Sequence, residues 1–142
     1  MSGVLKMSEA AVLAFHAMIY VAARETGFVT NAEIASALRS SEAHLAKVLQ
    51  RLSKAGLVKS IRGPRGGFIL GKDSGAITLR DIYELFEGSL EHDVCLLDAQ
   101  VCGNNCIFGD LLINVNDRVR EYMTNTRLKD AVEKSKKGMN CS

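Results

Sequence analysis

The sequence of 142 residues has no tryptophan, a single proline and no long hydrophobic run. Its longest apolar stretch, Ala10–Ala23, has about fourteen residues, which is too few to cross a bilayer. Lys6 before this stretch weakly imitates a signal peptide, but the helical pattern that continues beyond it favours a buried first helix. With 47% hydrophobic and 24% charged residues, the chain has the composition of a soluble globular protein. We therefore expect a cytoplasmic protein with no membrane partner.

The residue patterns that most enzymes need are also missing. The chain has no phosphate-binding glycine loop, no pairing of a nucleophile with a base, and no His-Glu metal motif. Its three histidines, His16, His44 and His92, are widely separated. We therefore expect a binding protein and not an enzyme, and the binding partner has to be inferred from specific sites.

Charge is distributed unevenly along the chain. Residues 1–72 contain ten Lys and Arg against four Asp and Glu, a net charge of +6. Residues 73–142 contain eight against twelve, a net charge of −4. A basic first half and an acidic second half indicate that only the first half contacts a polyanion, unless the charges merely cluster on solvated faces.

The spacing of apolar residues predicts a helical first half that ends in a hairpin. Helices are expected over Ser8–Arg24, Ala32–Leu38 and Glu42–Ala55, and about three residues join the last two. Two short strands, Leu57–Arg62 and Phe68–Leu70, flank a turn that contains glycine and proline. A helix-turn-helix followed by a short hairpin is a winged helix.

The second half predicts further helices on either side of an irregular segment. A helix over Thr78–Phe86 is followed by a loop with cysteines, a long helix over Ile107–Met123 and a last helix after Thr126. The expected fold is mainly α with a small β-hairpin wing: a winged helix-turn-helix plus a long C-terminal helix. We divide the chain into a winged DNA-binding domain, a cysteine loop, and the long helix with the last helix and tail (1–88, 89–106 and 107–142).

The third helix carries polar side chains that suit DNA. A helix fits the major groove, where each base pair presents a distinct pattern of donors and acceptors. Ser41 stands at the helix start, where an anion is favoured, and Gln50 could pair with adenine. The candidate contacts on this helix are Ser41, His44, Lys47, Gln50 and Arg51. The alternative is that these residues form only the solvated face of an amphipathic helix.

The predicted wing gives a more specific signal. Arg62 and Arg65 flank its turn, although a hairpin turn has no folding need for two arginines. Cationic side chains on a thin hairpin can enter a narrow minor groove, where the negative potential is enhanced. Gly66 allows close approach of the backbone, and Lys59 adds a charge on the first strand. We predict DNA contacts by these four residues.

The cysteines are confined to the second half of the chain. Cys95, Cys102 and Cys106 fall within twelve residues, and Cys141 lies in the tail. Such a cluster in a cytosolic chain is more typical of a metal or redox site than of disulfides. Thiolates are the usual ligands of iron–sulfur clusters, whereas the paired knuckles of structural zinc sites are missing here. The residues alone leave an iron–sulfur cluster, zinc and a thiol switch open.

Several stretches together resemble a bacterial family, the winged-helix iron–sulfur transcriptional regulators, which include IscR and NsrR. With the cysteine loop and the long helix, the resemblance covers nearly the whole chain. It implies a homodimer packed through the long helix, in which each subunit binds one half-site of an imperfect palindrome in double-stranded DNA. The stretches that carry it are Ala32–Ala35, His44–Leu49, Arg51–Leu52, Lys54–Phe68 and Thr78–Ile82.

The resemblance also implies a cofactor, a 2Fe–2S or 4Fe–4S cluster held by Cys95, Cys102 and Cys106. Part of the family has a histidine three residues beyond the last cysteine, but this chain has Gly109 there. Other relatives use a carboxylate near the start of the first helix of the partner subunit. Glu9 is the nearest match for that fourth ligand.

We therefore expect a DNA-binding transcriptional regulator that acts as a repressor and whose operator binding is switched by the cluster. The alternative is a cluster-free regulator of the same fold that uses thiol-redox chemistry or zinc. A winged helix that binds protein is a second rival, which the retained basic residues disfavour. The signal, such as nitric oxide or redox stress, stays open. So does the operator sequence, because Ala46 stands where some relatives have an acidic residue that discriminates between operators.

Overall fold

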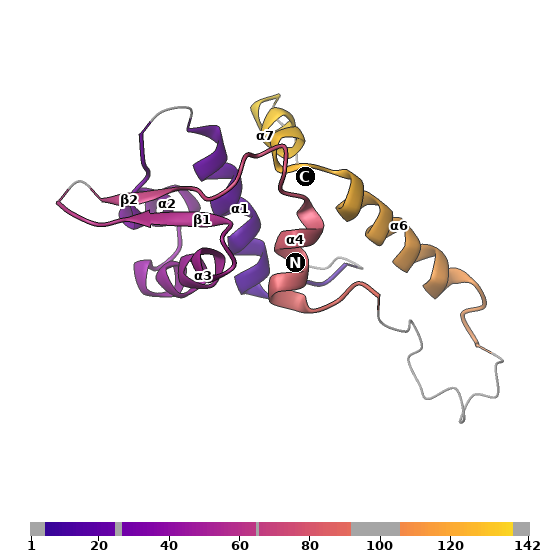
Figure 1. Cartoon of the computed structure of the whole chain (residues 1–142). Helices are drawn as coiled ribbons and strands as arrows, with labels where there is room; N and C mark the ends of the chain where they lie inside the picture. The colour runs from indigo at the N-terminus through magenta and orange to yellow at the C-terminus, as the bar shows by residue number, and fades with distance from the viewer. Residues whose placement is uncertain (1–4, 25–26, 65, 92–105, 138–142) are drawn as a thin grey trace.

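The computed structural model describes residues 5–24, 27–64, 66–91 and 106–137. As expected, the chain is mainly helical and carries one small antiparallel hairpin (Figure 1). None of the helices in these ranges is both long and apolar enough to cross a bilayer. The elements are α1 (Glu9–Ala23), α2 (Asn31–Leu38), α3 (Glu42–Lys54), β1 (Val58–Ile61), β2 (Gly67–Leu70), α4 (Leu79–Glu87), α6 (Leu111–Asn125) and α7 (Leu128–Lys136).

Helix α1 lies at the centre of the winged domain and contacts α2, α3, α4, α7 and β2. Ser8 caps its start, since the Ser8 hydroxyl accepts a hydrogen bond from the Ala11 backbone N–H at 3.1 Å. Small residues such as Ala14 and Ala17 are fully buried and let neighbouring helices approach closely. The apolar run that the sequence assigned to a buried helix therefore forms the middle of the core.

Helices α2 and α3 form the predicted helix-turn-helix. Thr30 caps α2 and Ser41 caps α3, each through its hydroxyl oxygen. Between the helices, Arg39 adopts a left-handed conformation with φ of 53°, which turns the chain sharply. One stripe of α3 is buried against the core and comprises Leu45, Val48, Leu49 and Leu52.

Strands β1 and β2 form the predicted wing, with Lys59 opposite Ile69 and Ser60 opposite Phe68. A further contact widens this sheet: Val29 and Phe68 exchange two backbone hydrogen bonds, at 3.0 and 2.8 Å. Gly67 permits this approach, because a Cβ there would lie 2.7 Å from the Val29 carbonyl oxygen. The wing is thus attached to the segment that precedes α2.

Helix α7 returns to the winged domain. The Leu128 N–H donates to the Ile77 carbonyl at 2.8 Å, and α7 packs on α1. Leu128 is fully buried in the same core cluster as the side chains of α1 and α3. The domain division predicted from the sequence grouped this last helix with the long helix in residues 107–142. In the structure, α7 packs on the core of the winged domain.

Helix α6 extends away from this core and contacts α4 (Figure 1). It begins at Leu111 and not at Ile107, because Gly109 has a positive φ of 56° and the preceding residues form turns. Met123 is its single buried residue. The predicted long helix is therefore present, but it begins one turn later and ends two residues later than predicted.

Candidate DNA interface and cysteine segment

The centre of the exposed face of α3 is formed by Lys47, Gln50 and Lys54. These residues are three and four positions apart, so they share one face of the helix, opposite the buried stripe. All three are exposed. Lys54 was outside the predicted set of contacts, although its helical spacing from Lys47 and Gln50 could have revealed it.

Two other predicted contacts, Ser41 and His44, lie at the edge of α3 that faces α1. They line an open hollow of about 460 Å³ together with Glu9 and His16 of α1. The Ser41 hydroxyl oxygen already accepts the backbone N–H of His44 at 3.1 Å, and His44 is half-buried. Ser41 is exposed at the start of the helix, which keeps the site open to a phosphate.

Arg51 lies on the edge of α3 that faces α4. Its Nη2 donates to the Leu85 carbonyl at 2.7 Å, and its guanidinium carbon lies 4.3 Å from the centre of the Phe86 ring. The residue is exposed overall, but its planar head contacts α4. The sequence could not reveal this contact, because 34 residues separate Arg51 from Leu85.

The opposite edge of α3 borders the wing. A second hollow, of about 320 Å³, separates the two and is lined by side chains of α3, the wing and the start of α2. Ala46, Gln50 and Lys54 are among its α3 residues, and Ser60 and Phe68 belong to the wing. The hollow lies between two elements that carry exposed basic side chains, Lys54 on α3 and Lys59 on the wing.

On the wing, Lys59 and Arg62, two of the predicted DNA contacts, are exposed. Gly66 has no room for a side chain, because a Cβ would lie 2.2 Å from the Ile61 carbonyl oxygen. Its backbone N–H donates to the Gly63 carbonyl at 2.9 Å and closes the turn. Arg65 lies outside the described residues.

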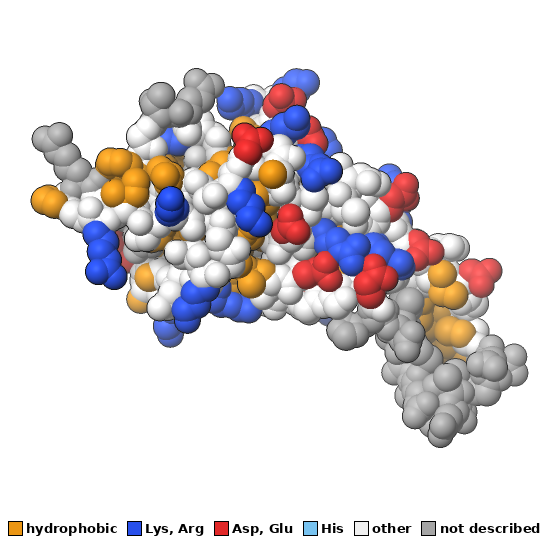
Figure 2. Space-filling model, in the orientation of Figure 1, with side chains coloured by type: hydrophobic (Ala, Val, Ile, Leu, Met, Phe, Trp, Pro, Cys, Tyr) orange, Lys and Arg blue, Asp and Glu red, His pale blue; other side chains and the backbone are white. Residues whose placement is uncertain are grey.

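The charge asymmetry of the sequence has a spatial counterpart. In the face shown in Figure 2, Lys and Arg side chains lie along the lower left, over α3, with few acidic side chains among them. To the right, over α4 and α6, acidic side chains gather and are interspersed with Lys and Arg side chains. A positive potential on one side of the molecule favours a polyanion there and disfavours it on the other.

Of the predicted cluster ligands, the structure describes Cys106 and Glu9. Cys106 is exposed and is followed by the turns that lead into α6. Glu9 is exposed in the first turn of α1, on the rim of the hollow next to α3. Cys95 and Cys102 lie outside the described residues. Within the described ranges, no group of three or more His, Cys, Asp or Glu could hold a metal ion.

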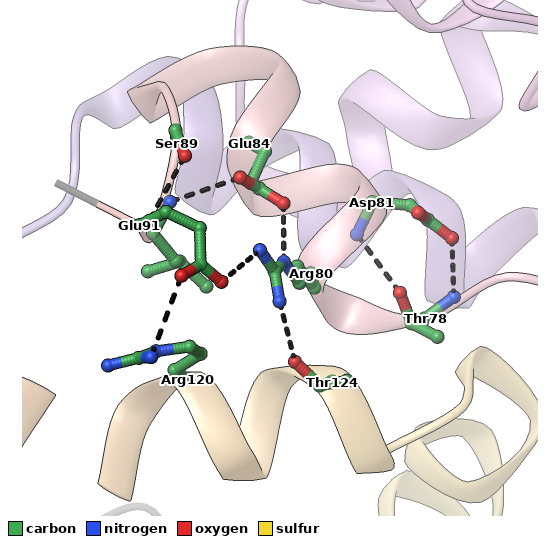
Figure 3. Close-up of polar contacts among 9 residues, drawn as sticks. Thr78, Arg80, Asp81, Glu84, Ser89, Glu91, Arg120 and Thr124 are labelled. Carbon is green, nitrogen blue, oxygen red and sulfur yellow. Dashed lines mark hydrogen bonds and ion pairs between the residues drawn. The ribbon is translucent and has the colours of Figure 1, made fainter. Parts of the chain in front are cut away.

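A network of charged side chains connects α4 with α6 (Figure 3). Arg80 donates to Glu84 at 2.5 Å, to Glu91 at 2.8 Å and to Thr124 of α6 at 3.3 Å. Glu91 also pairs with Arg120 of α6 at 3.6 Å. The hydrogen bond that Arg80 donates to Glu84 lowers the pKa of Glu84 and raises the pKa of Arg80.

A helix-turn-helix with a basic outer face, followed by a basic wing, defines a winged-helix DNA-binding protein. Comparison with known proteins then identifies the family. Residues 7–134 match the model of the Rrf2 family, described as iron-dependent transcriptional regulators. The chain belongs to the Rrf2 family and is a transcriptional regulator, and the predicted winged-helix resemblance is confirmed.

Individual relatives support this assignment. The chain is 35% identical to an HTH-type transcriptional regulator of Aquifex aeolicus, over 82% of this chain and 83% of the relative. It is 33% identical to the regulator IscR of an Enterobacter species, over 76% and 67% of the two chains.

Two solved structures of relatives superpose on nearly the whole chain. CymR of Bacillus subtilis, described as a global cysteine regulator, superposes with a TM-score of 0.78 at 32% identity, covering 91% of this chain and 97% of its own. IscR of T. potens superposes with a TM-score of 0.75 at 28% identity, covering 98% and 95%. The mainly helical fold with a wing is therefore confirmed.

Proposed function

We propose that this regulator binds palindromic operator DNA as a homodimer and that an iron–sulfur cluster on Cys95, Cys102 and Cys106 switches the binding. The observation that carries the proposal is the position of Cys106. Its exposed thiol stands at the end of the cysteine segment, directly before the turns that lead into α6. A change at the cysteines therefore acts next to the helix on which we expect the dimer to form.

Double-stranded DNA is the proposed partner of the basic face. We assign the centre of the major-groove surface to Lys47, Gln50 and Lys54, with Ser41 and His44 at its edge. On the wing, we assign Lys59, Arg62, Arg65 and the backbone at Gly66 to the adjacent groove or its phosphates. Of the described members of this set, all but the half-buried His44 and Gly66 are exposed, which supports the assignment.

A second copy of this chain is the proposed partner of α6. Leu111, Val115 and Tyr122 follow one another at helical spacing and are 55%, 42% and 42% exposed. Helix α6 packs mainly on α4, and Lys134 of α7 contacts Tyr122 at one end of the stripe. An exposed apolar stripe on such a helix is typical of an interface. Two copies of the chain bound in this way present two α3 helices to two half-sites.

The donor atoms present in the sequence suit the proposed cofactor. Three cysteine thiolates within twelve residues are soft ligands of the kind that iron–sulfur clusters require. Bound there, a 2Fe–2S or 4Fe–4S cluster supplies a centre that reacts with oxidants or nitric oxide at the protein surface. Glu9 of the partner subunit is the proposed fourth ligand, because its exposed carboxylate can reach a second chain.

The specific alternative is a thiol-based regulator without a cluster. The similarity to CymR favours it, since that relative is described as a cysteine regulator. The exposed thiol of Cys106 could equally form a disulfide or an adduct.

The deciding experiment is the visible absorption spectrum, with iron and sulfide content, of the chain purified without oxygen. We expect a brown protein that contains both elements. The variants Cys95→Ser, Cys102→Ser and Cys106→Ser should each lose the chromophore and retain the helical content of the fold. Cys141→Ser, a thiol outside the cysteine segment, is the matched control and should keep the chromophore.

Other outcomes separate the alternatives. A colourless chain that stays free of iron after reconstitution with iron and sulfide rules out the cluster. Zinc in its place supports a zinc-bearing regulator, and the absence of both supports the thiol switch. If the serine variants fail to fold, the cysteines are structural and the proposed switch is wrong.

A further inference from the structure

Arg51 acts as a cap on α4 although it belongs to α3. The last four carbonyls of a helix have no partner within the helix, and a cation is favoured next to them. Helix α4 has no basic residue in its own last turn. Arg51 supplies that charge from α3, by donating to the Leu85 carbonyl at 2.7 Å with its head over the Phe86 ring.

The start of α4 is attached to a different part of the molecule. Arg80, in its first turn, holds Glu91 at 2.8 Å and Thr124 of α6 at 3.3 Å. Glu84, one turn later, accepts the Leu90 backbone N–H at 3.0 Å. Glu91 directly precedes residues 92–105, which carry Cys95 and Cys102. Helix α4, with nine residues and a length of about 13 Å, therefore contacts α3 at its end and Glu91 and α6 through Arg80 at its start.

These contacts form a continuous series from α6 to α3. Arg120 of α6 pairs with Glu91, and Glu91 pairs with Arg80 of α4 (Figure 3). The Leu85 carbonyl at the end of α4 then binds Arg51 of α3. Packed helices transmit small displacements because their interfaces have few alternative arrangements. A shift of Glu91 that moves α4 will therefore move the carbonyl that fixes Arg51.

We propose that Arg51 is a positioning residue for α3 and that α4 couples it to Glu91. The proposal rests on the proposed DNA-binding function and deepens it. Arg51 orients α3 relative to DNA through α4, so its primary task is not to contact a phosphate. Glu91 sets the position of α4 through Arg80, and so determines how α3 is presented.

The proposal makes a distinctive prediction for paired variants. Arg51 and Glu91 do not contact each other, so independent effects on operator affinity would multiply within about twofold. We expect Arg51→Met and Glu91→Gln each to weaken binding. The double variant should lose less than the product of the two single losses, by a factor of about three or more.

The measurement is fluorescence anisotropy with a DNA duplex that the wild-type chain has selected from a random-sequence pool, over a range of salt concentrations. Arg51→Met should leave the salt dependence unchanged, whereas loss of a phosphate contact would reduce the slope of log affinity against log salt by about 0.9. Lys59→Met combined with Glu91→Gln is the matched control, because Lys59 lies on the wing and not on α3, and its two effects should multiply.

Two results would overturn the coupling. One is multiplication of the Arg51 and Glu91 effects within about twofold. The other is a reduced salt slope in Arg51→Met, which would make Arg51 a phosphate contact. If the wild-type chain selects no DNA, the proposed function fails, and hydrogen exchange still tests the coupling. Glu91→Gln should then speed exchange of the α3 amides near Arg51, and unchanged rates would disprove the coupling.

Discussion

The winged-helix core and helix α6 differ in how completely they bury their apolar side chains. In the core, Leu45, Ile82 and Leu128 come from three distant helices and are each fully buried. On α6, Leu111 and Val115 remain largely exposed, and Met123 alone is buried. The core therefore contains the contacts for its own stability, whereas α6 has an apolar surface that a second chain can cover.

Truncation of a core side chain should have the largest effect on stability. Leu49→Ala removes a fully buried side chain of α3 and is expected to cost about 2–5 kcal/mol of unfolding free energy. Urea denaturation at low protein concentration measures it. The same truncation at the exposed Leu111 should cost less than about 1 kcal/mol. Equal losses would mean that α6 is buried as completely as the core.

Placing a charge on the apolar stripe of α6 should separate association from folding. Val115→Asp would put an unpaired carboxylate into the proposed interface, at a cost on the order of 3 kcal/mol or more. We expect a folded monomer by sedimentation, with greatly weakened operator binding. Asn114→Asp, the neighbouring exposed position, adds the same charge beside the stripe and should stay dimeric. A dimeric Val115→Asp chain would exclude this stripe from the interface.

Removing single charges from the outer face of α3 should have a moderate effect. Lys47→Met and Lys54→Met should each weaken binding to all DNA sequences alike and reduce the salt slope by about 0.9. Lys136→Met, on α7, serves as the control for the loss of one positive charge. Unchanged binding in Lys54→Met would restrict the interface to the residues that the sequence predicted.

The smallest expected effect is a pH dependence of stability that comes from the Arg80–Glu84 pair on α4. Because Arg80 lowers the pKa of Glu84 in the folded chain, the ionised carboxylate stabilises the fold above the ordinary glutamate pKa of about 4.3. This stabilisation is lost as the pH falls through the lower, folded value. In Glu84→Gln, the free energy of unfolding should therefore fall less steeply as the pH is lowered, which acid denaturation measures. In an Arg80→Met background, where the main cause of the shift is removed, the same substitution should change little.

The positions of most helices follow from local signals. Ser8, Thr30, Ser41 and Thr78 cap their helices through hydroxyl groups, as polar residues before an apolar repeat predict. The start of α6 differs because Asp110 makes no side-chain capping bond and Gly109 turns the chain before it. Where a cap is weak, the apolar pattern alone locates a helix only to within a turn.

The candidate DNA surface was predictable in its composition and less so in its geometry. Periodicity placed Lys47 and Gln50 on the exposed face of α3, and the structure agrees. It could not reveal that Arg51, one position further round the same helix, donates to α4. A helical repeat shows which side chains avoid the core but does not show which neighbouring element they meet.

The helix-turn-helix, the basic wing and the family follow from local sequence patterns, because these features depend on residues close together in the chain. Which distant segments meet is visible in the folded structure alone. That structure attaches the wing to Val29, returns α7 to the core through Leu128, and connects Glu91 with α6. Such contacts are settled by packing and by the pairing of backbone and charged groups across the fold, and no local pattern in the sequence encodes their partners.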